Sequence, residues 1–138
     1  MDMLRAHNPR CLSKIRQVYN GKYAYHKSKR GPLTEMQHLM RMMEDYRYAH
    51  WTRVEEDTKV VKAIFWSHPI STQLFNQFPT VVLIDSTYKT NRYRIPLLEM
   101  VGVTSTHMTF TIAFAYMKNE TEPEVTWTLD KLKALLLP

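Results

Sequence analysis

The sequence has 138 residues, of which 44% are hydrophobic and 23% charged, a composition that excludes a disordered chain and fits one folded domain with an appendage. No apolar run approaches the roughly 20 residues of a membrane-spanning helix, and the first ten residues contain no apolar segment typical of a secretory signal. The single cysteine, Cys11, excludes both a disulfide framework and a Cys-rich zinc site within one chain. A reducing compartment is therefore expected.

The positive charge is concentrated at one end of the sequence. The net charge is +6, and residues 1–30 contain eight basic residues against one acidic residue, whereas the remainder is nearly balanced. Such asymmetry indicates either a polyanionic partner, usually nucleic acid, or a solvated basic helix without a partner.

Two helices are expected in residues 1–48, a basic helical lead-in. Asn8–Pro9 is typical of a helix start, and apolar residues recur at helical spacing from Leu12 to Tyr23. Gly31–Pro32 interrupts the pattern. The second helix begins at Thr34, which forms a capping-box pattern with Gln37 and precedes a methionine-rich apolar stripe that we expect to face the core.

Residues 49–79 predict a linking region with a strand hairpin and a short helix. Bulky residues typical of strands flank an acidic turn at Glu55–Thr58. His68–Pro69 ends the second strand, and residues 70–79 predict a short helix with Ser71 as its cap.

Residues 80–138 predict a three-stranded antiparallel meander followed by a helix. The apolar segments are 80–87, 94–105 and 108–117, and their short connections favour neighbouring strands. Pro96 indicates a sheet edge or a bulge in the second segment. The helix begins near Thr121, which forms a capping-box pattern with Glu124. The fold class is therefore α+β.

Asp85 is the unusual residue of the meander. It follows the apolar run Val81–Ile84, which is typical of a strand buried on both faces. A carboxylate at the end of such a strand either caps the backbone of Ser86 or Thr87, as short polar side chains do, or binds a metal ion.

The sequence around Asp85 resembles the transposase domain of Mutator-like elements (MULEs). Residues 78–120 carry the family's Asp-x-Thr-Tyr-x-Thr-Asn pattern, followed by its Pro and Val-Gly-Val positions, and the resemblance covers residues 60–136. The pattern is met by Asp85, Thr87, Tyr88, Thr90 and Asn91. The far-red-impaired-response regulators of plants share this domain. The resemblance implies that residues 80–138 form the first half of an RNase H-like fold, a truncated unit.

The resemblance also implies a catalytic and metal-binding role for Asp85. In the family this residue is the first of an Asp-Asp-Glu set that binds two Mg²⁺ or Mn²⁺ ions, which together activate water and stabilise the leaving oxygen. The second Asp and the Glu of the set would lie beyond Pro138. Glu99 and the acidic residues of the last helix do not match the family's catalytic positions. We therefore expect no tightly bound metal and no activity of this chain alone.

Weak, non-specific DNA binding is the expected remaining property, with phosphate contacts from basic side chains of the lead-in and of the segment after Asp85. The candidate residues are Lys14, Arg16, Lys22, Lys27, Lys29, Arg30, Lys89, Arg92 and Arg94. Other transposase chains are further expected partners, membranes are not, and the nucleus is the expected location. The main interpretation is a fragment of a MULE transposase. The alternatives are a domesticated nuclear regulator of the far-red-impaired-response type and a non-functional transposon relic.

Overall fold

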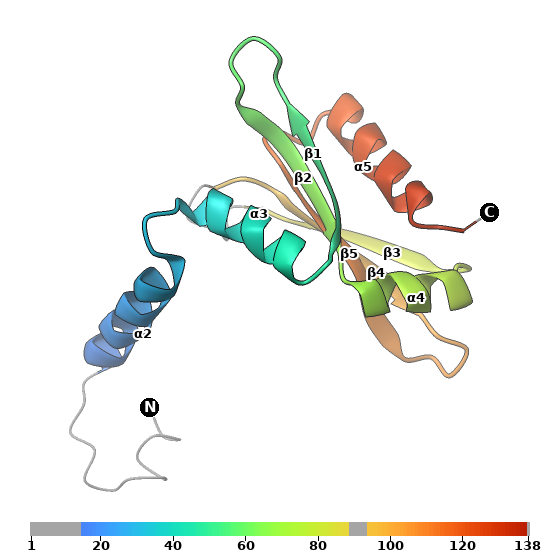
Figure 1. The fold of residues 1–138 in the computed structure, drawn as a ribbon. Coiled ribbons are helices and arrows are strands. Elements are labelled where there is room, and N and C mark those ends of the chain that lie inside the picture. The colour runs from blue at the N-terminus through green and yellow to red at the C-terminus, as the bar shows by residue number, and fades with distance from the viewer. Residues whose placement is uncertain (1–14, 89–93, 138) are drawn as a thin grey trace, which may run out of the picture. The chain divides into compact units, whose positions relative to one another are not determined.

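The computed structural model describes residues 15–88 and 94–137 (Figure 1). The chain divides into two compact units, and the division falls between Met42 and Met43, inside a helix. The first unit is helical and the second contains a sheet, so the α+β class predicted from the sequence is confirmed. No helix within the described ranges is long and apolar enough to cross a membrane.

The helical unit contains α2 (Ile15–Arg30) and the start of α3 (Glu35–Asp45). Gly31 ends α2 in the left-handed conformation with a φ of 65°, and its amide donates to the carbonyl oxygen of Lys27 at 3.1 Å. The predicted capping box begins α3: the Thr34 amide donates to Gln37 Oε1 at 2.9 Å, and the Gln37 amide donates to Thr34 Oγ1 at 3.2 Å. Both sides of the turn are therefore fixed by hydrogen bonds.

The apolar faces predicted for these two helices are less buried than expected. No residue of α2 is buried, and Tyr19 and Tyr23 are exposed. In α3 the buried residue is Met43, whereas Tyr46, which follows the helix, is exposed. The apolar stripe of the second helix, which by its spacing runs from Met36 to Tyr46, was expected to face a core, and this prediction is wrong for Tyr46. The helical spacing of Tyr19 and Tyr23 in α2 does not correspond to a buried face either.

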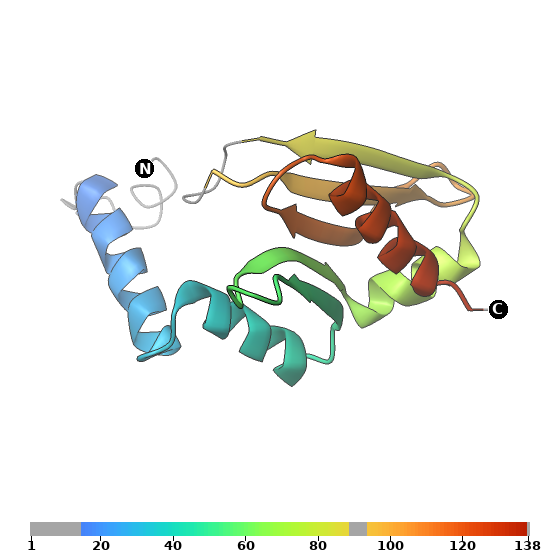
Figure 2. The same cartoon turned by 90° about the horizontal axis from the view of Figure 1, so that it is seen from above.

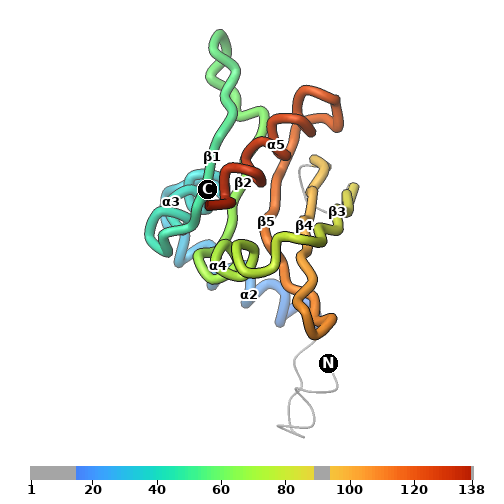
Figure 3. Tube along the Cα trace, turned by 90° about the vertical axis from the view of Figure 1, so that its right-hand side faces the viewer, coloured from blue at the N-terminus to red at the C-terminus, as the bar shows by residue number. Residues whose placement is uncertain are grey.

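The second unit is built on a five-stranded antiparallel sheet in the order β1-β2-β5-β4-β3 (Figure 3). Its strands are β1 (Ala49–Val54), β2 (Val61–Ser67), β3 (Val82–Thr87), β4 (Leu97–Val103) and β5 (Thr109–Met117). The predicted meander is confirmed, since β3 pairs with β4 and β4 with β5. The hairpin β1–β2 extends this meander, because β2 pairs along β5.

The turn between β1 and β2 is held by its acidic residue. The Glu55 amide donates to the Val60 carbonyl oxygen at 2.9 Å, and Lys62 Nζ lies 2.6 Å from Glu55 Oε1. The Lys62 ammonium, together with the hydroxyl of Thr58, holds the pKa of the Glu55 carboxyl below its ordinary value. The predicted acidic turn thus closes the hairpin at the expected position.

Pro96 lies just before β4, so it takes no position inside a strand. Its carbonyl oxygen accepts from the Met117 amide at 3.2 Å, across the start of the β4–β5 pairing. The expectation of an edge strand at this position is wrong, because β4 pairs on both sides. A register irregularity does occur in β4, but it falls between Met100 and Val101.

Helices α4 (Pro69–Gln77) and α5 (Glu122–Ala134) contribute to the same apolar core on one face of the sheet (Figure 2). The core contains Phe75 of α4 and Leu132 of α5, together with buried residues of β2, β4 and β5. Asn76 joins the two helix ends: its Nδ2 donates to the Leu135 carbonyl oxygen at 2.9 Å, and its Oδ1 accepts from the Leu137 amide at 2.7 Å. In each strand, the residues that alternate with those of the core point to the opposite face of the sheet.

The starts of these two helices differ in part from the prediction. His68 caps α4, because its Nδ1 accepts from the Ile70 amide at 3.1 Å, so the prediction of Ser71 as the cap is wrong. Thr121 is the N-cap of α5, as predicted, but its hydroxyl donates to the Glu124 carboxylate and makes no bond to the helix backbone. The predicted position of the helix start is thus confirmed, whereas the hydrogen bond of a capping box from the helix backbone to the Thr121 side chain is not formed.

Candidate functional site

Asp85 is an exposed residue inside β3 and does not end the strand, which continues to Thr87. Leu83 and Ile84 before it are 54% and 47% exposed, so the prediction of a strand buried on both faces is wrong. The reason is the place of β3 at the edge of the described sheet, where β4 is its neighbour, whereas α5 packs on β2 and β5. A continuous apolar run reports the composition of a strand but not its position in the sheet.

The strand register places a second carboxylate next to Asp85. Asp85 is directly opposite Glu99 of β4, and Glu99 is opposite Phe114 of β5. Because side chains alternate between the two faces, Asp85 and Glu99 lie on the face away from α4 and α5. Thr111 Oγ1 donates to Glu99 Oε1 at 3.3 Å and so helps to fix this carboxylate. The pairing register thus makes Glu99 a neighbour of Asp85.

The residues around Asp85 do not fit a two-metal site. One Mg²⁺ ion is usually held by one or two carboxylates with waters completing its six oxygen ligands, and a two-metal site needs carboxylates for two such ions. Within residues 15–88 and 94–137, no group of three or more His, Cys, Asp or Glu side chains could hold a metal ion. In the same ranges, the Asp85 carboxylate accepts no hydrogen bond from the backbone amide of Ser86 or Thr87, so the alternative local cap is not formed either.

A hollow of about 210 Å³ lies at the end of the sheet just beyond Asp85. It is lined by Tyr88, Arg94, Pro96, Lys118, Asn119 and Glu120. Tyr88 follows Asp85 by three residues, which in an extended strand is about 10 Å. Backbone hydrogen bonds hold the lining in place, since the Lys118 amide donates to the Lys62 carbonyl oxygen at 2.8 Å. The side chain of Ser86 donates to the Glu120 carboxylate at the rim.

The chemistry of this hollow suits an anion of moderate size. Arg94 and Lys118 supply two positive charges and Asn119 an amide, against the single carboxylate of Glu120, which Ser86 already engages. Arg and Lys are the side chains that most often hold phosphate oxygens. Arg94 also has a φ of 53°, the left-handed conformation, which fixes where its side chain leaves the backbone. A phosphate group on a backbone passing this end of the sheet would meet both cations.

The predicted DNA-contacting residues fall into two groups. Arg94 lies at the hollow beside Asp85, whereas Arg16, Lys22, Lys27, Lys29 and Arg30 all lie on α2. The remaining candidates, Lys14, Lys89 and Arg92, lie outside the described residues. Sequence reasoning missed Lys118 and Asn119, which directly follow β5. Only the antiparallel register, which brings the end of β5 next to the start of β4, could have indicated them.

Comparison with known proteins identifies the segment that carries this site. Residues 81–137 match the MULE transposase domain, and this match includes β3, β4, β5 and α5. The chain is 29% identical over 95 residues, or 69% of its length, to Protein FAR1-RELATED SEQUENCE 5 of Arabidopsis thaliana, and spans 12% of the length of that relative. No solved structure matches the chain. Residues 81–137 are therefore similar to the MULE transposase domain, and Asp85 and the residues that line the adjoining hollow lie inside this matched segment.

Proposed function

We propose that this chain is part of a Mutator-like DNA transposase and that it contributes a non-specific DNA contact at the sheet end beside Asp85. The observation that carries the proposal is the hollow that Arg94 and Lys118 both line, inside the segment that matches the transposase domain. Contacts to phosphate oxygens position a duplex without reading its sequence. DNA held there would pass close to the carboxylate that the family resemblance assigns to metal binding.

The proposal concerns DNA contact and not cleavage. Asp85 and Glu99 are the carboxylates that the register brings together, and these two alone do not supply the ligands of a two-metal site. Asp85 would be one ligand of such a site in an assembly that supplies the others, in an RNase H-like arrangement and in the nucleus. The role of this chain's own residues is to hold the DNA backbone near that carboxylate.

Replacing Lys118 by glutamine tests the contact. We expect the affinity for a 20-base-pair duplex of arbitrary sequence to fall about tenfold near 0.1 M salt, because one phosphate contact is lost. The measurement is fluorescence anisotropy of labelled DNA titrated with the full chain. Lys133→Gln is the matched control, since Lys133 is an exposed cation in the last turn of α5, away from the hollow. Equal losses in the two variants would show that only net charge matters and would contradict the proposal.

A second candidate function is that of a domesticated nuclear regulator that binds DNA without catalysis. The similarity to a FAR1-related protein of Arabidopsis thaliana favours it. In this case Asp85 would be an inherited residue without a reaction to serve, while the phosphate contacts would be retained.

The variant Asp85→Asn separates the two candidates by its effect in cells, whereas its effect on DNA affinity is the same for both. We expect DNA binding to tighten about twofold at low salt, because a negative charge some 10 Å from the phosphate is removed. Asp130→Asn, an exposed carboxylate on α5, serves as the control and should have no effect. In cells, a transposase that uses Asp85 would lose excision of a marked element. A regulator would keep its activity on a reporter gene, and loss of that activity would count against the second candidate.

A further inference from the structure

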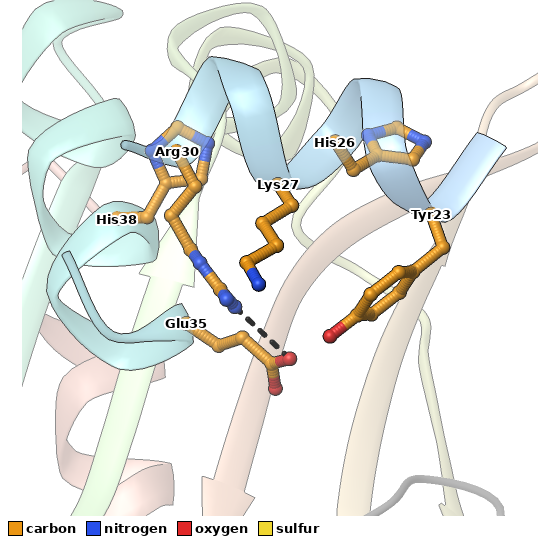
Figure 4. Close-up of a pocket in the computed structure, with 6 residues that line it drawn as sticks. All are labelled: Tyr23, His26, Lys27, Arg30, Glu35 and His38. Carbon is orange, nitrogen blue, oxygen red and sulfur yellow. Dashed lines mark ion pairs between the residues drawn. The ribbon is translucent and has the colours of Figure 1, made fainter. Parts of the chain in front are cut away.

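The turn between α2 and α3 forms a second hollow, of about 170 Å³, within the helical unit (Figure 4). It is lined by Tyr23, His26, Lys27, Arg30, Glu35 and His38. The left-handed Gly31 and the capping box of Thr34 and Gln37 fix the turn that joins the two helices. Local hydrogen bonds therefore fix the turn that brings the two sets of lining residues together.

The residues of α2 that line this hollow lie on one face of the helix. His26, Lys27 and Arg30 follow Tyr23 by three, four and seven residues, which places all four side chains on the same side of adjacent turns. Figure 4 shows the Lys27 ammonium, the Arg30 guanidinium and the Tyr23 hydroxyl pointing into the same space, with the Glu35 carboxylate from α3 beside them. Hydrogen-bond donors from two turns of helix thus converge on one small volume.

Positive charge is in excess in this hollow. Glu35 Oε1 lies 3.1 Å from Arg30 Nη1, so the one carboxylate of the lining is already engaged by one guanidinium. Lys27 forms no ion pair within the described ranges, and Arg30 Nε is buried with no hydrogen-bond acceptor there. A buried donor without an acceptor is costly, and native structures usually explain it by a bound water or ion. The hollow therefore has a cation without an ion pair and a buried donor without an acceptor, and Glu35 is its one carboxylate.

The rest of α2 extends this surface. The helix contains five basic residues and no acidic residue, and Arg16 lies on the same face as Tyr23 and Lys27. From Arg16 to Lys27 the helix rises about 16 Å. A duplex presents about one phosphate charge per 1.7 Å of its axis, so a polyanion can engage both residues at once, whereas a single small anion cannot.

We propose that the hollow between α2 and α3 binds a phosphate group of a nucleic-acid backbone, with Lys27 and Arg30 as the contacting cations and Tyr23 as a hydroxyl donor. This inference deepens the proposed function and rests on it, because it adds a second DNA contact on a different unit of the chain. The contact is independent of Arg94 and Lys118, so the two can be removed separately.

The test is the anisotropy titration of a labelled 20-base-pair duplex with the full chain carrying Lys27→Gln. We expect binding to weaken about tenfold near 0.1 M salt and the slope of log affinity against log salt to become shallower by about one. Lys133→Gln is the matched control, because Lys133 is an exposed cation of α5 that lines neither hollow. We expect it to weaken binding by less than twofold. Circular dichroism of both variants checks that the helices are intact.

The possible results separate this inference from the proposed function. Equal effects of Lys27→Gln and Lys133→Gln would show that only the net charge matters and would overturn the hollow as a site. A tenfold loss for Lys27→Gln with no change for Lys118→Gln would support the hollow and overturn the contact beside Asp85. No binding by the unmodified chain, even at low salt, would overturn both. Binding to phosphatidylserine vesicles but not to duplex, with the same dependence on Lys27, would overturn the assignment to nucleic acid.

Discussion

Replacing Phe65 by alanine should lower the free energy of unfolding of the sheet unit by about 3–5 kcal/mol, because a fully buried aromatic ring is removed and a cavity remains. Phe65 is 0% exposed in the middle of β2. Its ring contacts Trp51 of β1 edge-on, with 5.7 Å between the centroids, and its strand position is opposite Ala115 of β5. The side chain thus joins the hairpin to the meander.

The measurement is urea unfolding followed by circular dichroism and by tryptophan fluorescence. Trp51, Trp66 and Trp127 lie on β1, β2 and α5, so the fluorescence reports on both the hairpin and the last helix. We expect the two signals to give one coincident transition, shifted to lower urea in Phe65→Ala. Val60→Ala, at a half-exposed turn position, should change the free energy by less than about 0.5 kcal/mol.

Two outcomes of this measurement would contradict the fold described. A loss of less than about 1 kcal/mol in Phe65→Ala would show that the hairpin does not share the core of the meander. A broad change without a cooperative transition in the unmodified chain would favour the interpretation as a transposon relic that does not fold by itself.

Replacing Gly102 by alanine should cost about 1–3 kcal/mol, although alanine usually suits a strand better than glycine. Gly102 of β4 is directly opposite Phe110 of β5, whose ring covers it. A Cβ at position 102 would lie 2.4 Å from Phe110 Cζ and 2.7 Å from its Cε1, so the ring would have to move. The glycine is therefore required by the close approach of the ring.

A double-mutant cycle makes this prediction specific. In a Phe110→Ala background the ring is absent, and Gly102→Ala should then be neutral or stabilising by up to about 1 kcal/mol, because alanine lowers the entropy of the unfolded chain. The free energies come from the same urea titrations. If Gly102→Ala were equally destabilising in both backgrounds, the contact with Phe110 would not explain the glycine.

The sequence predicted the elements whose signals are local. The second helix was predicted at Thr34 and its capping box was confirmed, because both partners lie within four residues. The meander from Val82 to Met117 followed from apolar segments separated by short connections, and the helix after Thr121 followed from its cap position and spacing. Residue types and short-range spacing are sufficient for such features.

The features that depend on long-range pairing were not predictable. The run Val81–Ile84 indicated a buried strand, but the sheet order places β3 at an edge, and no local pattern encodes sheet order. The pairing of Asp85 with Glu99 and the place of Arg94 and Lys118 in the lining of one hollow both depend on strand register. The sequence thus predicted Asp85 and Arg94 as residues of the candidate site, whereas the place of Lys118 in this site was found only in the structure.

The most direct test of DNA contact as the function is the salt dependence of binding by the unmodified chain. Anisotropy of a labelled 20-base-pair duplex would be measured between 0.02 and 0.2 M salt, with a second duplex of unrelated sequence. Phosphate contacts at Lys118, Arg94 and the α2 hollow predict a log–log slope of about −2 to −4 that is the same for both duplexes. Absence of binding at the lowest salt, or binding that does not weaken as salt rises, would contradict the account.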